Sequence, residues 1–512
     1  MKNIFLFILL ITTSINAFAI EVVSLPLPKS DKIVIKLMFR NGSVSDPSGM
    51  QGLTNLTATL LLDGGTVQKS SGQIKEIMYP WAARMSSSTD KEVTVFTFEF
   101  HKDHELEMLP LITEFFNQPG FHDEDFQRIK SNEINYVNEV IRASSDEDYS
   151  KMGLEDLLFR GTNYQHMVSG TTSGLEKITA EDVRKHYKNA FTASGLLLGV
   201  AGNYSDGLIS KLSEAFSKMS QTPVPAIAVK ANTPSGIEVE IISKTNALGS
   251  AIFAGFPLPI TRKDNDFAAL MIANSWLGEH RKSYSRLYQK IREQRSMNYG
   301  DYTYIEWYEN GGSNMLPVPG FPRSANYFSM WIRPVQTAEG LKKQYPELGN
   351  IQVGHAHFAL RMALKEMKTI TDNGMSDEDF KLTKDFLGSY IKLYVQTPSK
   401  QLGFLMDSKF YGRTDYIKEI SGLLEKVTLA QVNAAMKKYW QINNMFVTIV
   451  TDDSEAEPLK ASLMSNTPSP MSYSDALKTT LPVSLLKEDD EVAGFPLNVK
   501  KVTVLSSDST FR

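Results

Sequence analysis

Few side chains in this sequence could carry out catalysis or bind a metal. The chain has 8 His and no Cys in 512 residues, so cysteine nucleophiles, iron–sulfur clusters and cysteine-bound zinc are excluded. Two groupings contain possible metal ligands: His101-Lys102-Asp103-His104-Glu105, and His355 with His357. The first follows the strand-like run 93–100, which favours solvated polar residues at a strand-to-helix corner. The second pair is a poor ligand set, because residues two apart on a helix point in different directions.

Other hydrolytic and phosphate-binding chemistry is not supported. The Ser-rich run 85–89 lacks the G-x-S-x-G context of a serine nucleophile, and Gly64-Gly65-Thr66 lacks the Lys of a phosphate-binding loop. The aromatic run 302–308 alternates in strand period, which is typical of a half-buried strand and would also suit a surface lining a substrate path.

Arg292 and Tyr299 lie seven residues apart. A guanidinium and a phenol held in place can both donate hydrogen bonds to a developing oxyanion. An ordinary amphipathic helix whose Arg pairs with an acid, followed by a Tyr that starts a strand, would give the same pattern. The spacing alone leaves both interpretations open.

The chain repeats itself, and the repeat predicts the elements that must position these residues. Glu124-Asp125-Phe126 and Glu378-Asp379-Phe380 each open a helical segment, at an offset of 254. Thr179 and Thr428, at an offset of 249, each suit the N-cap of a helix that leads into an apolar, strand-like run. Each copy also begins with a strand-like run that leads into a helix. We therefore expect two homologous α+β domains, each a mixed or antiparallel sheet packed with helices.

The domain boundaries follow from composition. Residues 1–19 read as a secretory signal peptide, with a charged start, an apolar run too short to span a bilayer and the cleavage triplet Ala17-Phe18-Ala19. The N-terminal domain is expected at 20–222, a Pro-rich linker at 223–235 and the C-terminal domain at 236–465, although the Pro-rich stretch could also be a surface loop within one domain. A second irregular stretch, 311–320, predicts a long loop. Residues 466–512 are expected to wrap the second domain as an extended tail.

Charge and hydropathy limit the partners and the compartment. The formal net charge is −4, which provides no basic field for binding nucleic acid. No apolar segment after residue 19 is long enough to cross a membrane. The absence of Cys suits an oxidising compartment. We expect an exported protein, located in the periplasm and without an integral membrane segment once the leader is removed.

The two α+β copies and the motifs of the first one carry a family resemblance. A strand, Asp-Pro-Ser-Gly-Met-Gln-Gly-Leu at 46–53, a helix and then Gly-Gly-Thr resemble the insulinase/pitrilysin family of inverted zinc metallopeptidases over nearly the whole mature chain. The resemblance implies a clam-like chamber, of which this chain would be one half. In active members the helix carries H-x-x-E-H, in which two His bind Zn²⁺ and the Glu activates water, and a later helix supplies a third ligand, a Glu.

This chain departs from that pattern. Alignment on Gly52-Leu53 places Asn55 and Thr59 at the two His positions and Ala58 at the catalytic Glu. The distal Glu falls near Tyr136, with Glu133 and Glu139 one helical turn to either side, so a shift in register could restore a carboxylate but no imidazole. We therefore expect no metal site, no cofactor and no independent peptidase activity.

Arg292 and Tyr299 match a pair that, in the family, contacts the substrate backbone and stabilises the tetrahedral intermediate. In several two-chain members one subunit holds the zinc motif, while the other has lost it and keeps this pair. The resemblance thus implies a non-catalytic subunit that forms a heterodimer with a zinc-bearing homologue, closes the chamber and contributes Arg292 and Tyr299 to peptide hydrolysis. The alternative is a catalytically inert scaffold or peptide-binding protein of the cell envelope.

Overall fold

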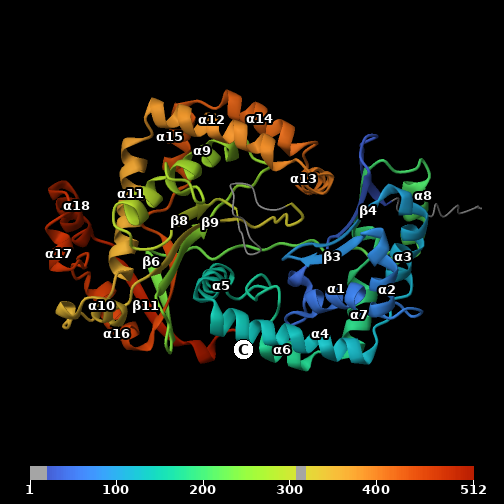
Figure 1. Ribbon diagram of the computed structural model, residues 1–512, viewed down its shortest axis with the longest axis horizontal. Coiled ribbons are helices and arrows are strands. Elements are labelled where there is room, and N and C mark those ends of the chain that lie inside the picture. The colour runs from blue at the N-terminus through green and yellow to red at the C-terminus, as the bar shows by residue number, and fades with distance from the viewer. Residues whose placement is uncertain (1–19, 307–318) are drawn as a thin grey trace, which may run out of the picture.

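The computed structural model describes residues 20–306 and 319–512. The expected leader and most of the expected loop at 311–320 fall outside this described part. Two β-sheets, each covered by helices, form two lobes joined side by side (Figure 1). This arrangement confirms the α+β class and the two-domain organisation. Within the described ranges, no helix combines the length and apolar character needed to cross a membrane.

The first domain holds a five-stranded sheet in the order β1-β5-β2-β4-β3. The alternating apolar residues of β2 and β4 bury one face of the sheet beneath α1 and α3. Its elements are β1 (Glu21–Pro26), β2 (Lys32–Phe39), α1 (Leu53–Asp63), α2 (Ser71–Met78), β3 (Arg84–Thr89), β4 (Thr94–His101), α3 (Glu105–Asn117), α4 (Asp123–Asn135), the π-helical segment η4 (Tyr136–Ser144), α5 (Asp146–Phe159), α6 (Thr172–Lys177), α7 (Ala180–Ala190), β5 (Leu196–Gly202) and α8 (Leu208–Phe216).

The second domain holds a six-stranded sheet in the order β11-β6-β10-β7-β9-β8. Residues 220–234, which contain no helix or strand, connect it to the first domain. Its elements are β6 (Ile237–Lys244), β7 (Ser250–Pro257), α9 (Phe267–Gly278), the π-helical segment η6 (Tyr288–Glu293), β8 (Asp301–Tyr304), β9 (Tyr327–Val335), α10 (Ala338–Gln344), α11 (Ala356–Asn373), α12 (Asp377–Tyr394), α13 (Pro398–Phe410), α14 (Tyr416–Lys426), α15 (Leu429–Tyr439), β10 (Met445–Asp452), α16 (Asp453–Ser465), α17 (Asp475–Lys478), α18 (Val483–Ala493) and β11 (Val499–Ser506).

The strand order confirms the internal repeat. Without β11, the second sheet reads β6-β10-β7-β9-β8, which is the order of the first sheet with each strand replaced by its counterpart. β1 pairs parallel with β5, as β6 does with β10. The predicted N-caps are also present: Thr179 and Thr428 each form a capping box, with Asp182 and Gln431 respectively. The repeat seen in the sequence is therefore a repeat of topology.

The tail differs from the extended chain predicted for residues 466–512. It contains the helices α17 and α18, and its strand β11 joins the edge of the second sheet beside β6, in parallel register. Thr503 and Leu505 lie opposite Glu240 and Ile242 of β6. The chain then returns to the first domain, where Tyr149 donates a hydrogen bond to the carbonyl of Ser507. The tail folds because the edge of β6 offers it unpaired backbone groups.

Each domain contributes one helix that packs on the sheet of the other domain. α5 of the first domain packs on β7 and β10, and α13 of the second domain packs on β2 and β5. Both contacts are close enough to require glycine: an added Cβ would lie 2.5 Å from the Thr448 side chain at Gly153 of α5, and 2.4 Å from the Met406 sulfur at Gly199 of β5. Figure 1 shows α5 in the middle of the molecule and α13 reaching toward the first domain.

A buried ion-pair network also joins the domains. Arg323 of the second domain is 1% exposed and donates two hydrogen bonds to Asp90, at 2.7 and 2.8 Å, and one to Glu155 of α5 at 2.8 Å. Lys91 lies 3.2 Å from the same Glu155. Because buried charges are costly unless they are paired, this network favours one fixed placement of the two domains.

Candidate functional site

The degenerate motif lies on α1, where the sequence predicted it. The helix follows Gly52, whose φ of 99° is in the left-handed region that favours glycine. Asn55 and Thr59 lie one turn apart on the same helix face and are partly exposed, whereas Ala58 is 1% exposed. Ala58, at the position of the catalytic Glu, has no group that could act as a base.

A buried network of side chains anchors the start of α1. The carboxylate of Asp46 accepts hydrogen bonds from the backbone N–H groups of Gly52 and Thr54, at 2.7 and 2.8 Å, and from the Thr54 hydroxyl at 2.6 Å. His166 Nε2 lies 3.0 Å from Asp46, and His186 Nε2 lies 2.9 Å from the Thr54 hydroxyl. Sequence reasoning missed both His, because more than a hundred residues separate each from its partner and no local motif marks them.

The carboxylate that faces the degenerate motif is Glu133, on α4. Its side chain hydrogen-bonds with the amide of Asn55. Burial raises the pKa of Glu133 to about 7, although the Asn55 hydrogen bond opposes the shift. Tyr136, the position aligned with the distal Glu, lies one turn further on and is 44% exposed, and Glu139 is exposed. Glu133 and Tyr136 thus both border the site, and α4 places one carboxylate, that of Glu133, beside Asn55.

These residues border a cavity of about 770 Å³ whose walls come from both domains. The outer edge of β3 runs along it, and β3 pairs only with β4 within the described residues. Lys36 of β2 lines the cavity and is 8% exposed. Burial lowers the pKa of Lys36, although the nearby carboxylates of Glu99 and Asp407 oppose this shift. The full lining is Lys36, Asn55, Ser86, Ser87, Ser88, Thr89, Val95, Thr97, Glu99, Asn132, Glu133, Tyr136, Val168, Ser169, Pro319, Gly320, Phe321 and Ser399.

The residues at this position do not fit a zinc ion. Tetrahedral Zn²⁺ sites use thiolate, imidazole and carboxylate ligands, and only the carboxylate of Glu133 is available here, beside an amide and a hydroxyl. In residues 20–306 and 319–512, no group of three or more His, Asp and Glu could hold a metal ion. Without a bound metal to activate water, this arrangement does not provide the zinc-hydrolase mechanism and can bind a ligand through hydrogen bonds.

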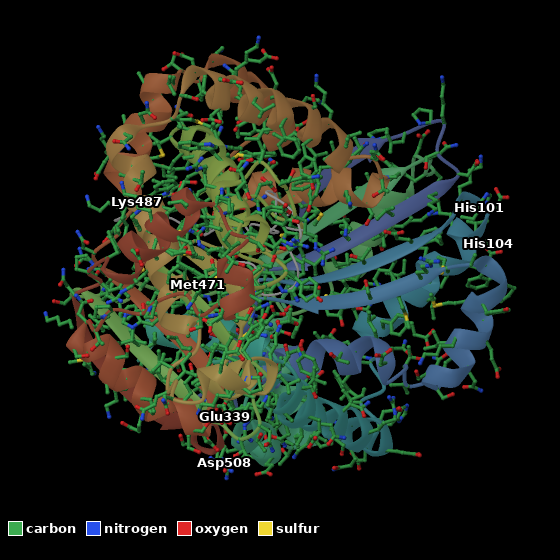
Figure 2. All side chains as sticks on the ribbon, turned by 60° about the vertical axis from the view of Figure 1, so that its left-hand side comes forward. His101, His104, Glu339, Met471, Lys487 and Asp508 are labelled. Carbon is green, nitrogen blue, oxygen red and sulfur yellow. The ribbon has the colours of Figure 1, made fainter. Side chains whose placement is uncertain are left out.

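The two His groupings considered from the sequence lie elsewhere. Figure 2 shows His101 and His104 at the outer end of the first domain, where His104 stacks on Trp81 with ring centroids 5.5 Å apart. His355 and His357 are buried at the start of α11, and burial lowers their pKa values to about 4 and 3. Neutral, separately enclosed imidazoles are structural at these positions.

Arg292 and Tyr299 lie on the second domain and are accessible. The Arg292 side chain is 36% exposed, and Tyr299 is 79% exposed. The nearest carboxylate to Arg292 in the described chain is that of Glu293, at 3.8 Å. Neither Arg292 nor Tyr299 lines the cavity around β3. Any chemistry they perform is therefore directed away from the degenerate motif of this chain.

The tail holds the segment that carries this pair. Arg295 is fully enclosed and pairs with Asp489 at 2.7 Å and Glu488 at 2.8 Å, both on α18, and Lys290 pairs with the same Glu488. Tyr473 donates a hydrogen bond to the other oxygen of Asp489. These carboxylates belong to an acidic run, Glu488-Asp489-Asp490-Glu491, whose partners no local pattern in the sequence reveals. Figure 2 shows Met471 and Lys487 on the second domain and Asp508 at its lower end, which traces the path of the tail.

Two repeated α+β domains, the first with a metal motif that has lost its ligands on α1, define a two-domain metallopeptidase homologue. Sequence comparison agrees. The insulinase (peptidase family M16) model matches residues 21–174, and the model of the peptidase M16 inactive domain matches residues 177–329. Together they cover more than half of the chain, which therefore belongs to the insulinase family, as an inactive member.

Individual relatives include proteins named as inactive and others named as zinc proteases, such as the uncharacterized zinc protease YmxG of Bacillus subtilis, 23% identical over 57% of this chain and 69% of its own length. The non-peptidase homolog YmxG of Helicobacter pylori is 22% identical over 82% of this chain and 88% of its own length. The probable inactive metalloprotease YmfF of Bacillus subtilis is 25% identical over 37% of this chain and 45% of its own. The solved peptidase M16 inactive domain of Pseudomonas fluorescens superposes with a TM-score of 0.70 at 18% identity, covering 84% of this chain and 95% of that one. This structural similarity supports the assignment of the fold.

Proposed function

We propose that this chain is the non-catalytic subunit of a two-chain zinc metallopeptidase. It closes the chamber over a zinc-bearing homologue and presents Arg292 and Tyr299 to the peptide bound there. We place this assembly in the periplasm, in keeping with the leader-like start of the sequence. The zinc and the attacking water belong to the partner, because this chain lacks the groups that would hold and activate them.

The observation that carries the proposal is the accessibility of a rigidly held Arg and Tyr. A guanidinium with no strong ion pair can bind an incoming carbonyl or oxyanion without first losing a partner. The ion pairs of Arg295 with α18 fix the backbone three residues from Arg292. They hold the Arg292 guanidinium in place and so lower the entropy cost of binding a ligand through it. An Arg needed only for packing would be expected to be enclosed, as Arg295 is.

The first experiment is to tag the mature chain, purify it from native periplasmic extract and identify the proteins that copurify. We expect a homologue with an intact H-x-x-E-H motif in near-equal amount. In the purified complex, Arg292→Ala should lower kcat for a quenched-fluorescence peptide by about 100-fold, the size of effect seen when one oxyanion donor is removed. The matched control is Arg184→Ala, a half-exposed Arg of α7, which should leave kcat unchanged.

A second candidate, a peptide-binding protein of the envelope, is favoured by the cavity around β3. An extended peptide could pair with the free edge of this strand while its side chains meet the hydroxyl-rich lining. Recovery of the chain without a zinc-bearing homologue, together with binding of unstructured peptides by the chain alone, would support this candidate and overturn the first.

A further inference from the structure

Several cationic and aromatic side chains lie around Tyr302, whose phenol contacts the backbone of Tyr299. The buried phenol of Tyr302 donates a hydrogen bond to the carbonyl of Tyr299 at 3.3 Å. The guanidiniums of Arg281 and Arg333 both lie close enough to the phenol of Tyr302 to oppose the rise that burial causes in its pKa, and the ring of His280 stacks on that of Tyr302 with centroids 4.1 Å apart. Tyr302 therefore lies beside two guanidinium groups and contacts the backbone of Tyr299.

Arg292 belongs to the same cluster. Its guanidinium lies over the ring of Tyr288, 5.9 Å from the centroid, and Tyr288 packs against Tyr302 and Tyr304. Arg281, the most exposed of the three guanidiniums, adopts a φ of 55°. A left-handed backbone is unfavourable for Arg and persists only where the surroundings hold it, often at functional sites.

Few charged carboxylates oppose these cations. Glu147 pairs with Arg333 at 2.8 Å, and Glu293 lies 3.8 Å from Arg292. Burial holds the pKa of Asp301 well above its usual range and raises that of Glu279 to about 8, so burial favours the neutral form of both carboxyl groups. Arg281 forms no ion pair with any residue of the described chain. The cluster thus has a net positive charge.

The neighbouring strand β8 is enclosed: its four residues are at most 5% exposed, and Asn274 donates a hydrogen bond to the carbonyl of Thr303. β8 is the edge strand of the second sheet and, in the part of the chain that the structure describes, pairs only with β9. It is the counterpart of β3, whose surroundings are hydroxyl-rich and contain Glu99 and Glu133. The two edge strands of the repeat thus have different side-chain surroundings. β8, whose surroundings are positively charged, lies near Arg292 and Tyr299.

We propose that the surface formed by Arg281, Arg292, Arg333 and Tyr299 binds the side-chain carboxylates of an extended acidic peptide. Planar guanidiniums match the geometry of a carboxylate, and the phenol of Tyr299 adds a donor. The inference rests on the proposed function in one respect, that this surface faces the substrate. It goes further in naming acidic peptides as the preferred class and Arg281 as the residue that selects them.

The test compares two fluorescein-labelled twelve-residue peptides of Gly, Ser and Ala that carry three Glu in one case and three Gln in the other. Fluorescence anisotropy with the full mature chain at pH 7 gives the Kd of each. We expect the Glu peptide to bind about 10-fold more tightly, because its carboxylates form charge-assisted hydrogen bonds with the guanidiniums. The gain is modest because solvent weakens each of these bonds at an exposed surface. Arg281→Gln should reduce that ratio to about 3-fold or less, and the ratio should fall with added salt.

The control is Arg184→Gln, which removes the same charge from α7 of the first domain and should leave the ratio unchanged. Circular dichroism and thermal unfolding establish that both variants fold. Equal binding of the two peptides, no detectable binding, or a ratio unaffected by Arg281→Gln would each overturn the inference. Because these measurements use the chain alone, they fail or succeed independently of the effect of Arg292→Ala on a partner's hydrolysis, which tests the proposed function.

Discussion

At the scale of single residues, the site keeps one carboxylate and has lost the rest of its metal chemistry. Glu133 now serves as a hydrogen-bond partner of Asn55, in a position where burial favours its neutral form. The loss is a matter of side chains alone, because α1 and α4 still bring Asn55 and Glu133 into contact. Rebuilding the ligands should therefore rebuild the site.

We predict that the triple variant Asn55→His, Ala58→Glu, Thr59→His takes up one zinc ion per chain, with Glu133 as the third protein ligand. Inductively coupled plasma mass spectrometry after dialysis against micromolar zinc measures the uptake. Adding Glu133→Gln to the triple variant should weaken zinc binding by more than about 10-fold, since even outer-shell partners contribute that much. If the fourth substitution has no effect, Glu133 is not the distal position.

Glu133 should also make stability depend on pH. Its folded-state pKa of about 7 exceeds the ordinary value of 4.5, so the folded state binds the proton more tightly and the free energy of unfolding falls as pH rises from about 4.5 to about 7. We predict that Glu133→Gln is more stable than the wild type at pH 8 by about 1–3 kcal/mol, and that the gain shrinks toward pH 4.5. Urea unfolding at both pH values, with Glu139→Gln as the exposed control on the same helix, measures the difference.

At the scale of elements, the tail helix α18 is part of the site's architecture. Its two carboxylates are the partners of Arg295, which has no contact with solvent. A buried cation that loses its partner destabilises the fold more than a surface pair does. The consequence should be local, because Arg295 belongs to the segment between Arg292 and Tyr299.

We predict that Asp489→Asn lowers the free energy of unfolding by about 2–4 kcal/mol and speeds amide hydrogen exchange in residues 288–299. Hydrogen exchange followed by mass spectrometry gives the local readout, and urea unfolding gives the global one. Glu491→Gln is the matched control, since Glu491 is 55% exposed and lies 3.4 Å from Lys365; it should change stability by less than about 0.5 kcal/mol. Unchanged exchange in Asp489→Asn would show that the tail does not hold this segment.

At the scale of the whole molecule, the two domains form one unit through exchanged helices and the Arg323 network. α5 and α13 each complete the hydrophobic core of the other domain, so neither sheet keeps its full cover if the domains separate. Burial of Arg323 between Asp90 and Glu155 adds a polar contact that tolerates little displacement.

We predict that Arg323→Met lowers the free energy of unfolding by about 3–5 kcal/mol, because it leaves the carboxylates of Asp90 and Glu155 buried with fewer partners. Calorimetry should also show the single transition broaden or split as the domains uncouple. Arg184→Met, at a half-exposed position, serves as the control for removal of an Arg. A sharp, unshifted transition in Arg323→Met would mean that helix exchange alone couples the domains.

The sequence by itself determined the features that depend on local patterns. The repeat, the Thr179 and Thr428 caps, the strand and helix types and the loss of both imidazoles at Asn55 and Thr59 follow from residue types and short spacings. Tertiary structure decided the rest, because contacts between distant segments leave no local signal. Only the packing of α4 on α1 brings Glu133 beside Asn55, and only the fold pairs Arg295 with α18. The path of the tail likewise depends on the free edge of β6, which exists once the second sheet has formed.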